Sequence, residues 1–356
     1  MIFNLILVVF LSVLLSYFVI RLTNKFDRVM YPRNILSVQR FHTGHVPRIG
    51  GAPVFLIFSV AMFLLNIQEG EGVLLILWLA SLPIFVAGLV EDLSSKVPPL
   101  TRLVFTFVSI AIVFFGLGVD VSFLGFAWID GLLSSHYIIN LLFTLLVMGA
   151  AINSLNIIDG FNGLVAGYSI FSLLAIAYVS HLLGDNFIMQ LSLILAASIS
   201  GFFVFNFPFG KIFMGDGGAY FIGFMSATIS LILVDRHEEL SNWFVLLIFI
   251  YPMYELLYSI YRRKIIYKVD ASQPDANHLH SLVYRKLISC DRFKHDKVIC
   301  NSMVSPFMWL LSLVGIIPAV VWFDNQTMLI ISAFMFMFIY TIIYKYISSD
   351  RFKFNH

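Results

Sequence analysis

The chain has 356 residues, of which 60% are hydrophobic and only 12% charged, and its formal net charge is +2. Its mean hydropathy is +0.93. Soluble domains contain roughly 45–50% apolar residues, so this composition excludes a soluble globular protein. We therefore expect a lipid bilayer around the chain and no nucleic-acid partner. One polytopic membrane domain over residues 1–356 is favoured over the two soluble domains that length alone suggests.

Apolar stretches close to the ~20 residues that an α-helix needs to cross a bilayer recur along the chain. They predict an all-α membrane bundle of about eleven transmembrane helices. In chain order they lie at about 2–21, 51–67, 73–90, 103–119, 137–155, 164–183, 187–207, 219–234, 243–261, 304–323 and 327–345. No charge precedes the first stretch and no small-residue cleavage signal follows it, so we expect a retained helix and not a signal peptide.

Basic residues are divided very unevenly between the two sets of loops that this topology defines. Of the 22 lysines and arginines, only Arg236 falls on the second side. The positive-inside rule places the basic side in the cytoplasm. An odd number of spans then puts the N-terminus outside and the C-terminus inside. Because the outward connections are short, we expect the chemistry at the cytoplasmic face.

Each predicted cytoplasmic loop contains a polar motif, and the outward loops contain nothing comparable. The motifs occupy residues 40–51, 91–102, 156–163, 206–218 and 274–280. The third reads Asn-Ile-Ile-Asp-Gly-Phe-Asn-Gly and lies between two apolar stretches. Polar groups at a bilayer edge cost several kcal/mol unless they are satisfied. A single such motif is more often a turn or a cap, but five on one side of a membrane protein predict a functional site.

The residue types in these loops favour magnesium and phosphate chemistry. Converging carboxylates and amides suit Mg²⁺, which prefers oxygen ligands, and basic residues beside glycine-rich turns suit a diphosphate. The adjacent acids Glu91 and Asp92 should raise each other's proton affinity, so that one of them could act as a base. His278 and His280 alternate on a loop, which favours phosphate contact over zinc.

Two further residues have two open interpretations each. Glu255 lies near the inner end of the ninth predicted span, three residues after Pro252. An intramembrane acid is a functional candidate, but a structural partner for the basic residues at 262–264 fits the sequence equally well. Phe213 could stack on a nucleotide base or anchor its loop in lipid.

Taken together, the five motifs resemble those of the polyprenyl-phosphate N-acetylhexosamine-1-phosphate transferases. The resemblance covers roughly residues 35–285. It includes the His–Pro–Gly-Gly loop, the acidic pair with following prolines, Asn-x-x-Asp-Gly-x-Asn-Gly, Met-Gly-Asp-x-Gly and Asp-x-x-His-x-His, in the family's order. It implies ten or eleven helices and a cytoplasmic site in a bacterial inner membrane, which agrees with the periplasmic N-terminus and the cytoplasmic C-terminus that the charge distribution predicts.

The resemblance also implies a reaction, in which a sugar 1-phosphate passes from a UDP-N-acetylhexosamine to undecaprenyl phosphate and UMP is released. Carried over residue by residue, it implies the following roles. Asp216 and Asn156 would hold Mg²⁺, or Mn²⁺ in its place, Asp159 would order the metal shell, and Asp92 with Glu91 would deprotonate or position the lipid phosphate. Asn162 and Phe213 would contact uracil, and His278 and His280 would bind phosphate and stabilise the leaving group. Further substrate contacts would come from Arg40, His42, Arg48, Lys211 and Asn277.

Departures from the family pattern narrow the substrate. Glu91 replaces the usual first Asp of the acidic pair, Arg102 stands where a lysine is common, and Ser281 replaces a histidine that many members have. The last difference, together with the Arg-x-His-x-Gly-x-x-Pro-Arg loop at residues 40–48, favours the branch that initiates O-antigen and other surface polysaccharides. The alternative within the family is the phospho-MurNAc-pentapeptide transferase of peptidoglycan synthesis, and a secondary transporter is the alternative from another class. Dimers are common in the resembling family, so a homodimer is a possible assembly.

Overall fold

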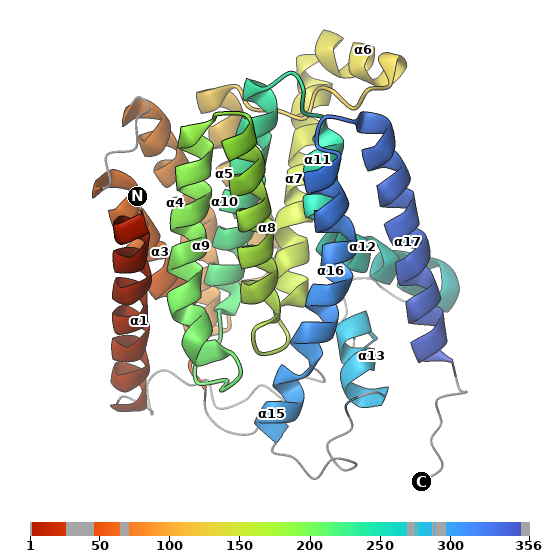
Figure 1. Ribbon diagram of the computed structural model, residues 1–356. Coiled ribbons are helices and arrows are strands. Elements are labelled where there is room, and N and C mark those ends of the chain that lie inside the picture. Colours follow the sequence, from red (N-terminus) through yellow and green to blue (C-terminus); the bar gives the residue numbers. More distant parts are fainter. Residues whose placement is uncertain are drawn as a thin grey trace.

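The computed structural model describes residues 2–25, 46–64, 71–268, 275, 277–286, 288 and 297–349. Every regular element in this part of the chain is a helix, and the helices form one bundle (Figure 1). They are α1 (Ile2–Lys25), α3 (Gly51–Leu64), α4 (Glu71–Ser94), α5 (Pro99–Leu117), α6 (Ala127–Ser135), α7 (Tyr137–Ile158), α8 (Leu164–Leu182), α9 (Asn186–Asn206), α10 (Gly215–Arg236), α11 (Asn242–Ile248), α12 (Ile250–Tyr261), the π-helix η1 (Arg262–Tyr267), α13 (Leu279–Lys286), α15 (Lys297–Ser302), α16 (Val304–Val321) and α17 (Gln326–Ser348). The predicted all-α polytopic fold is confirmed.

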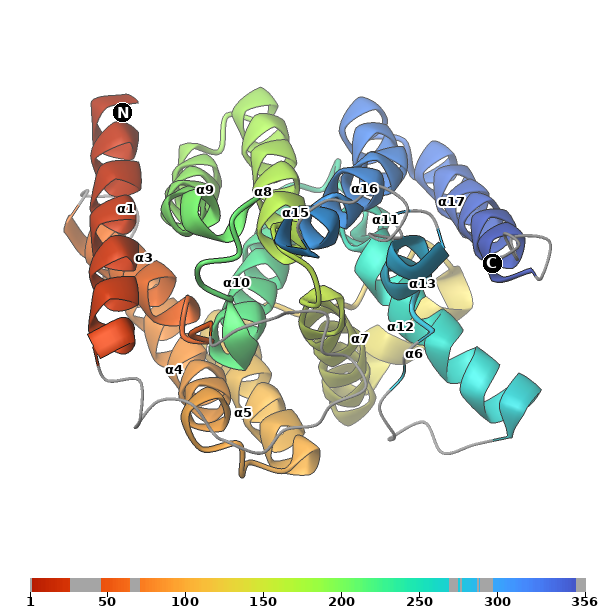
Figure 2. The same ribbon diagram turned by 90° about the horizontal axis from the view of Figure 1, so that it is seen from below.

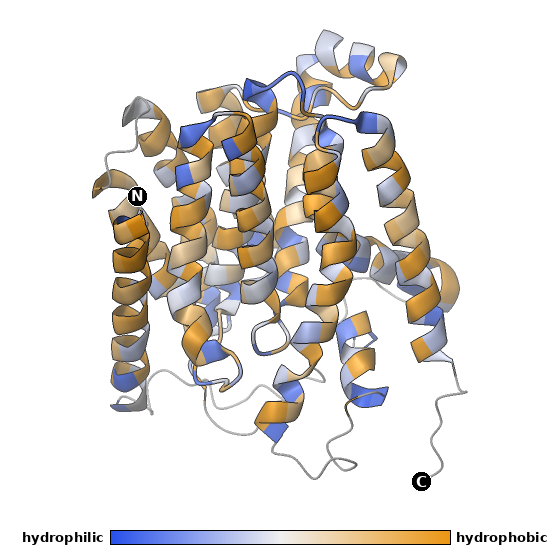
Figure 3. Cartoon of the chain, in the orientation of Figure 1, coloured by the Kyte–Doolittle hydropathy of each residue, from blue (hydrophilic) through white to orange (hydrophobic). Residues whose placement is uncertain are grey.

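The helices correspond closely to the predicted spans. Over the described ranges, nine are long and apolar enough to cross a membrane, and the bent pair α11–α12 makes a tenth. The span predicted at 51–67 is α3, which has only 14 residues in the described part. Figure 3 shows apolar residues along the sides of the bundle and hydrophilic residues at its two ends. This distribution is that of a multi-pass membrane protein.

The motif-bearing turns gather at one end of the bundle. α13 and α15 lie at this end, together with the turns that follow α7 and α9, and α1 runs toward it (Figure 1). The last helix, α17, also ends on this side of the bundle. The opposite end carries α6, which was not predicted. A hydrogen bond from the backbone N of Leu124 to Asp130 Oδ1 (2.7 Å) folds the segment that leads into α6.

α10 is the most buried helix of the bundle and lies among α3, α4, α7, α8 and α9 (Figure 2). Its first turn approaches α3 and α4 through glycines. A Cβ at Gly88 would lie 2.5 Å from the Cα of Gly217, and a Cβ at Gly51 would overlap Gly218. Small residues allow such backbone contact between membrane helices. The close packing sets the start of α10 beside the end of α4.

The span after α10 is broken into α11 and α12, which meet at 77°. Pro252 lacks the N–H that would otherwise bond to the carbonyl of Ile248 in a continuous helix. The hydroxyl of Tyr168 donates to that carbonyl instead, at 2.6 Å. The carbonyl of Ile248 is therefore hydrogen-bonded in spite of the bend. The bend directs α12 across the bundle toward α13 (Figure 2).

Candidate active site

The carboxylate of Asp92, at the end of α4, caps the first turn of α10. Its Oδ1 accepts a hydrogen bond from the backbone N of Asp216 (2.8 Å), and its Oδ2 accepts one from the backbone N of Gly217 (2.9 Å). The first N–H groups of a helix have no partner within the helix, and they favour a negative charge. Gly215 has a φ of +75°, and a Cβ there would collide with the carbonyl oxygen of Arg48. A glycine is therefore required for this turn to close over Asp92.

Asp216 links three elements through its own carboxylate. Asn156, near the end of α7, donates from Nδ2 to Asp216 Oδ1 at 3.1 Å. Arg102, in the first turn of α5, forms an ion pair with Asp216 Oδ2. The residue is only 9% exposed. Asn156 and Asp216 were predicted to share a metal, and the structure brings them together. Arg102 was not among the predicted site residues, although its place after the acidic pair and two prolines was the available signal.

Asp159 ends α7 and adds a third carboxylate to this region. It is half-buried. Its pKa is raised to about 7, chiefly by burial. The charge of Arg48 and a hydrogen bond from the backbone of Gly215 act to lower the pKa, and the charge of Asp216 acts to raise it. Burial, more than nearby negative charge, is thus the reason that this carboxyl holds its proton more tightly than in water.

The donor set of this region fits a hard divalent cation. Asp216, Asp159 and the amide oxygen of Asn156 are oxygen donors of the kind that Mg²⁺ binds, and Asn156 already lies within hydrogen-bond distance of Asp216. In the structure, the guanidinium of Arg102 is the cation that pairs with the carboxylate of Asp216. Among the described residues, no three His, Cys, Asp or Glu side chains are already grouped as a metal site.

Glu91 and Asp92 diverge, because neighbouring residues on a helix do not face one another. Glu91 Oε2 accepts a hydrogen bond from the backbone N of Val97 at 2.7 Å and so closes the turn after α4. The two carboxylates therefore lack the close approach that their predicted mutual effect on proton affinity requires. Asp92 has different partners, on α10.

Asn162 lies inside the protein and not on an exposed surface. It is 1% exposed, its backbone N donates to Asn301 Oδ1 at 2.8 Å, and its Nδ2 donates to Ser302 Oγ at 3.0 Å. Its carbonyl accepts from Ser305 Oγ at 2.6 Å. These bonds tie the turn after α7 to α15 and α16. The geometry supports an anchoring role for Asn162 and offers no exposed polar group for the predicted contact with uracil.

The other predicted substrate contacts are more dispersed. The backbone N of Phe213 donates to the carbonyl of Pro47 (2.8 Å), which pairs the loop before α10 with the segment before α3. Arg48 is exposed. Lys211 is also exposed and lies with its Nζ 5.0 Å from the centre of the Phe209 ring. Arg40 and His42 lie outside the described residues.

The two predicted histidines lie side by side at the start of α13. Their rings stack with centres 5.3 Å apart. The ring of His280 packs against Phe161 (5.5 Å between centres), which joins the histidine loop to the turn after α7. Burial lowers the pKa of His280 to about 4, so this side chain is neutral at neutral pH. It can offer an N–H to a phosphate but not a positive charge.

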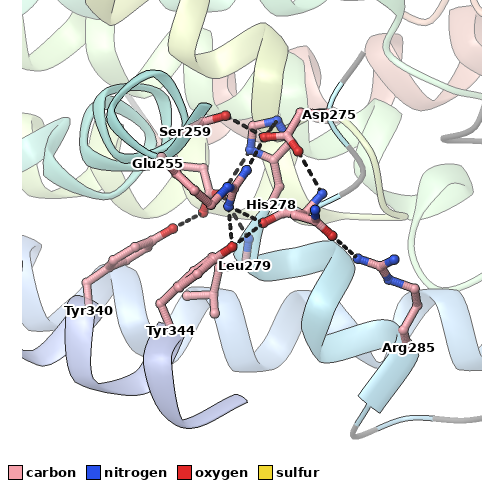
Figure 4. A network of polar contacts seen from close by, with 10 residues as sticks. Glu255, Ser259, Asp275, His278, Leu279, Arg285, Tyr340 and Tyr344 are labelled. Carbon is pink, nitrogen blue, oxygen red and sulfur yellow. Dashed lines mark hydrogen bonds and ion pairs between the residues drawn. The ribbon is translucent and has the colours of Figure 1, made fainter. Parts of the chain in front are cut away.

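A dense polar network surrounds His278 (Figure 4). Glu255 in α12 bonds to His278 and to Tyr340, and Arg262 pairs with Asp275. Asn277 is held by its backbone carbonyl, which accepts from Arg262 and Tyr344, and by its side chain, which accepts from Arg285. Arg262 therefore has a different acid as its partner, and the interpretation of Glu255 as the partner of the basic residues at 262–264 does not account for its contacts.

Comparison with known proteins gives a consistent result. The family model described as glycosyl transferase family 4 matches residues 74–234, from α4 to α10, which include Asp92, Asn156 and Asp216. A Bacillus subtilis (strain 168) protein named probable undecaprenyl-phosphate N-acetylglucosaminyl 1-phosphate transferase is 28% identical over 93% of this chain and 90% of its own length. A Thermotoga maritima undecaprenyl-phosphate alpha-N-acetylglucosaminyl 1-phosphate transferase is 28% identical over 70% of this chain and 72% of its own. A Staphylococcus aureus phospho-N-acetylmuramoyl-pentapeptide-transferase is 36% identical over 33% of this chain and 35% of its own.

Proposed function

Because the chain belongs to glycosyl transferase family 4, we propose that it is a polyprenyl-phosphate N-acetylhexosamine-1-phosphate transferase. It transfers the sugar 1-phosphate from a UDP-N-acetylhexosamine to undecaprenyl phosphate and so begins an O-antigen or another surface polysaccharide. The observation that carries the proposal is the meeting of Asp92, Asn156 and Asp216 at the first turn of α10, at the end of the bundle. An acceptor with a polar head and an apolar tail needs such a site, where its head reaches water while its tail stays in lipid.

The reaction is one phosphoryl transfer. An oxygen of the lipid phosphate attacks the β-phosphorus of the UDP-sugar. The bond from that phosphorus to the oxygen bridging the two phosphates breaks, and UMP leaves with the bonding electron pair. Positioning and neutralisation of charge supply most of the acceleration in such reactions.

Asp92 is the residue that we place at the lipid phosphate. Each of its carboxylate oxygens accepts one backbone N–H, so about half of its acceptor capacity remains free. Held by two bonds to a buried helix, the carboxylate is fixed in position, as the orientation of a nucleophile requires. Asp92 can then accept a proton from the lipid phosphate or hold it by a hydrogen bond.

We propose that Asp216, Asn156 and Asp159 hold Mg²⁺, or Mn²⁺ in its place, against the donor's diphosphate. The ion would supply positive charge to the phosphate oxygens as the β-phosphorus is transferred. Arg102 would leave Asp216 for a phosphate oxygen, for which a guanidinium is equally suited. Arg48, close enough to lower the pKa of Asp159, is the second cation of the site.

His278 and His280 are proposed to face the phosphates of the leaving UMP. His280 is neutral at neutral pH because burial lowers its pKa to about 4, so we assign it a hydrogen-bonding role. We place this end of the bundle on the cytoplasmic side of a bacterial inner membrane, because the basic residues concentrate in its loops. The N-terminus is then periplasmic.

Two alternatives receive less support. The S. aureus pentapeptide transferase aligns with 33% of this chain, whereas the B. subtilis N-acetylglucosaminyl 1-phosphate transferase aligns with 93%. A secondary transporter would place its polar groups near the middle of the membrane between repeats, but Asp92, Asp159 and Asp216 gather around the start of α10.

A donor screen tests the proposal. The purified full-length protein is given undecaprenyl phosphate in detergent, Mg²⁺, and in turn UDP-GlcNAc, UDP-GalNAc and UDP-MurNAc-pentapeptide, and UMP is measured. We expect Mg²⁺-dependent UMP release from one of the first two donors. Release from the pentapeptide donor alone would move the protein to the peptidoglycan branch. Absence of release from all three, with the B. subtilis relative active in the same preparation, would refute the proposal.

A further inference from the structure

Glu255 has contacts on three sides that the proposed reaction does not yet explain. It lies in α12, inside the bent span, and is 1% exposed. Its Oε1 accepts from His278 Nδ1 at 3.0 Å and from the backbone N of Leu279 at 2.9 Å. Its Oε2 accepts from the hydroxyl of Tyr340 at 2.7 Å. An ionisable group is costly at such a depth unless it is fully bonded, and this one is.

These contacts determine which nitrogen of His278 carries a hydrogen. A backbone N–H can only donate, so the bond from Leu279 identifies Glu255 Oε1 as an acceptor. The second bond to the same oxygen must then also come from a donor, which is Nδ1–H of His278. In the neutral ring this leaves Nε2 without a hydrogen. Nε2 faces the acidic side of the loop, 3.7 Å from Asp275 Oδ2.

The loop that carries His278 is clamped by the same helices that carry Glu255 and Tyr340. Ser259 in α12 donates to Asp275 Oδ2 at 2.5 Å, and the guanidinium of Arg262 pairs with the same carboxylate. Tyr344 in α17, one turn after Tyr340, donates to the carbonyl of Asn277 at 3.0 Å. Figure 4 shows these side chains converging on the loop from α12 and α17. The backbone of this loop and the ring of His278 are thus both held in place by contacts from α12 and α17.

We propose that Glu255, supported by Tyr340, is a positioning residue for His278: it holds the imidazole by Nδ1–H, so that Nε2 is the nitrogen that can take up a proton and donate it to a phosphate oxygen of the leaving UMP. This inference rests on the proposed function. Glu255, His278 and Tyr340 all lie beyond residues 74–234, which the family model matches. The bent span α11–α12 and the last helix α17 therefore belong to the working site and are not only a membrane anchor.

The first test needs no substrate. The full-length protein is labelled with ¹⁵N-histidine, and the signal of His278 is assigned by its loss in His278→Gln. We expect the wild-type signal to show hydrogen on Nδ1 and not on Nε2. A signal from the Nε2–H tautomer would overturn the proposal whether or not the protein proves to be a transferase.

The second test uses three variants of similar size. Glu255→Gln keeps an acceptor for the Leu279 N–H but removes the charge. We expect kcat to fall roughly 10- to 100-fold, as for other residues that orient a functional histidine. KM for the UDP-sugar should stay almost unchanged. Tyr340→Phe removes one bond to Glu255 and should lower kcat about 3- to 10-fold. Tyr254→Phe is the matched control, because its hydroxyl joins the same two helices through Thr341 (2.9 Å) without touching the histidine loop.

The outcomes separate positioning from packing. A folded Glu255→Gln protein with the kcat of the wild type would overturn the proposal. So would a Tyr254→Phe variant that loses as much kcat as Tyr340→Phe, since the effect would then come from the contact between α12 and α17. If the wild type shows no transfer with any donor, the proposed function fails, and the tautomer measurement still decides the role of Glu255.

Discussion

Asp92 and Asp216 lie 124 positions apart in the chain, and a hydrogen bond of 2.8 Å joins the carboxylate of the first to the backbone N of the second. The other oxygen of Asp92 holds the next backbone N, that of Gly217. Asp92 therefore has a structural role in capping α10 besides the chemical role that we propose. These two roles can be separated by experiment.

The variant Asp92→Asn should lose both stability and activity, by different amounts. One backbone N–H would face an amide NH₂ in place of an oxygen, so we expect the free energy of unfolding to fall by about 1–3 kcal/mol. Turnover should fall at least roughly 100-fold, because the amide cannot take a proton. Reversible unfolding in SDS and UMP release measure the two effects. An unchanged unfolding free energy would show that the cap contributes little.

Replacing Arg102 should strengthen metal binding and lower turnover. Arg102 forms an ion pair with Asp216 Oδ2, so the variant Arg102→Gln frees that oxygen and removes a positive charge. We expect Mn²⁺, observed by electron paramagnetic resonance without nucleotide, to bind about 3- to 10-fold more tightly, while turnover falls because the diphosphate loses a cation.

Asp120→Asn, at the end of the bundle away from the start of α10, serves as the control for Mn²⁺ binding. It removes a carboxylate bonded to Asn140 and should leave the Mn²⁺ affinity unchanged. Weaker Mn²⁺ binding in Arg102→Gln would mean that the guanidinium does not compete with a metal for Asp216.

Stability should depend on pH through Asp159. Its pKa rises from 3.8 in the unfolded chain to about 7 in the folded protein, chiefly because of burial. Between these values the folded state binds more protons, so metal-free stability should fall as pH rises from about 4 to about 7 and then level off. We expect Asp159→Asn to be more stable than the wild type by about 1–2 kcal/mol at pH 8, after discounting for solvent screening, and equally stable near pH 4.

Mg²⁺ should reduce the difference between the wild type and Asp159→Asn at pH 8, because it neutralises the wild-type carboxylate. Unfolding curves at both pH values, with and without Mg²⁺, give the comparison. A wild type that is as stable as Asp159→Asn at pH 8 without metal would show that the burial of Asp159 carries no cost.

Asn162 should act on stability and not on nucleotide binding. It is 1% exposed and bonds to Asn301 and Ser302. The variant Asn162→Ala keeps the bond of its backbone N but leaves Ser302 without one partner, so we expect a loss of about 1–2 kcal/mol in unfolding free energy. KM for the UDP-sugar should stay within about twofold of the wild type. A large rise in KM at unchanged stability would support the uracil contact that the sequence suggested.

The helices could be predicted because a bilayer requires long apolar stretches, and the motifs could be assigned to one side because basic residues concentrate there. Neither rule says which helices are neighbours. The bond from Asp92 to α10 and the ion pair of Arg102 depend on the glycine contacts among α3, α4 and α10. The bonds of Glu255 depend on the bend at Pro252, where Tyr168 satisfies the free carbonyl. Asn162 looked like a ligand because its motif is polar, and only its contacts with α15 and α16 show that it is buried.

The most direct test of the central claim follows the β-phosphate of the donor. The protein is given undecaprenyl phosphate, Mg²⁺ and UDP-GlcNAc or UDP-GalNAc labelled with ³²P in the β-phosphate, and the lipid and water phases are then separated. Transfer of a sugar 1-phosphate moves the label into the lipid, in an amount equal to the UMP released. Label that stays in the water phase while sugar appears on the lipid would contradict this account, because the protein would then transfer the sugar without its phosphate.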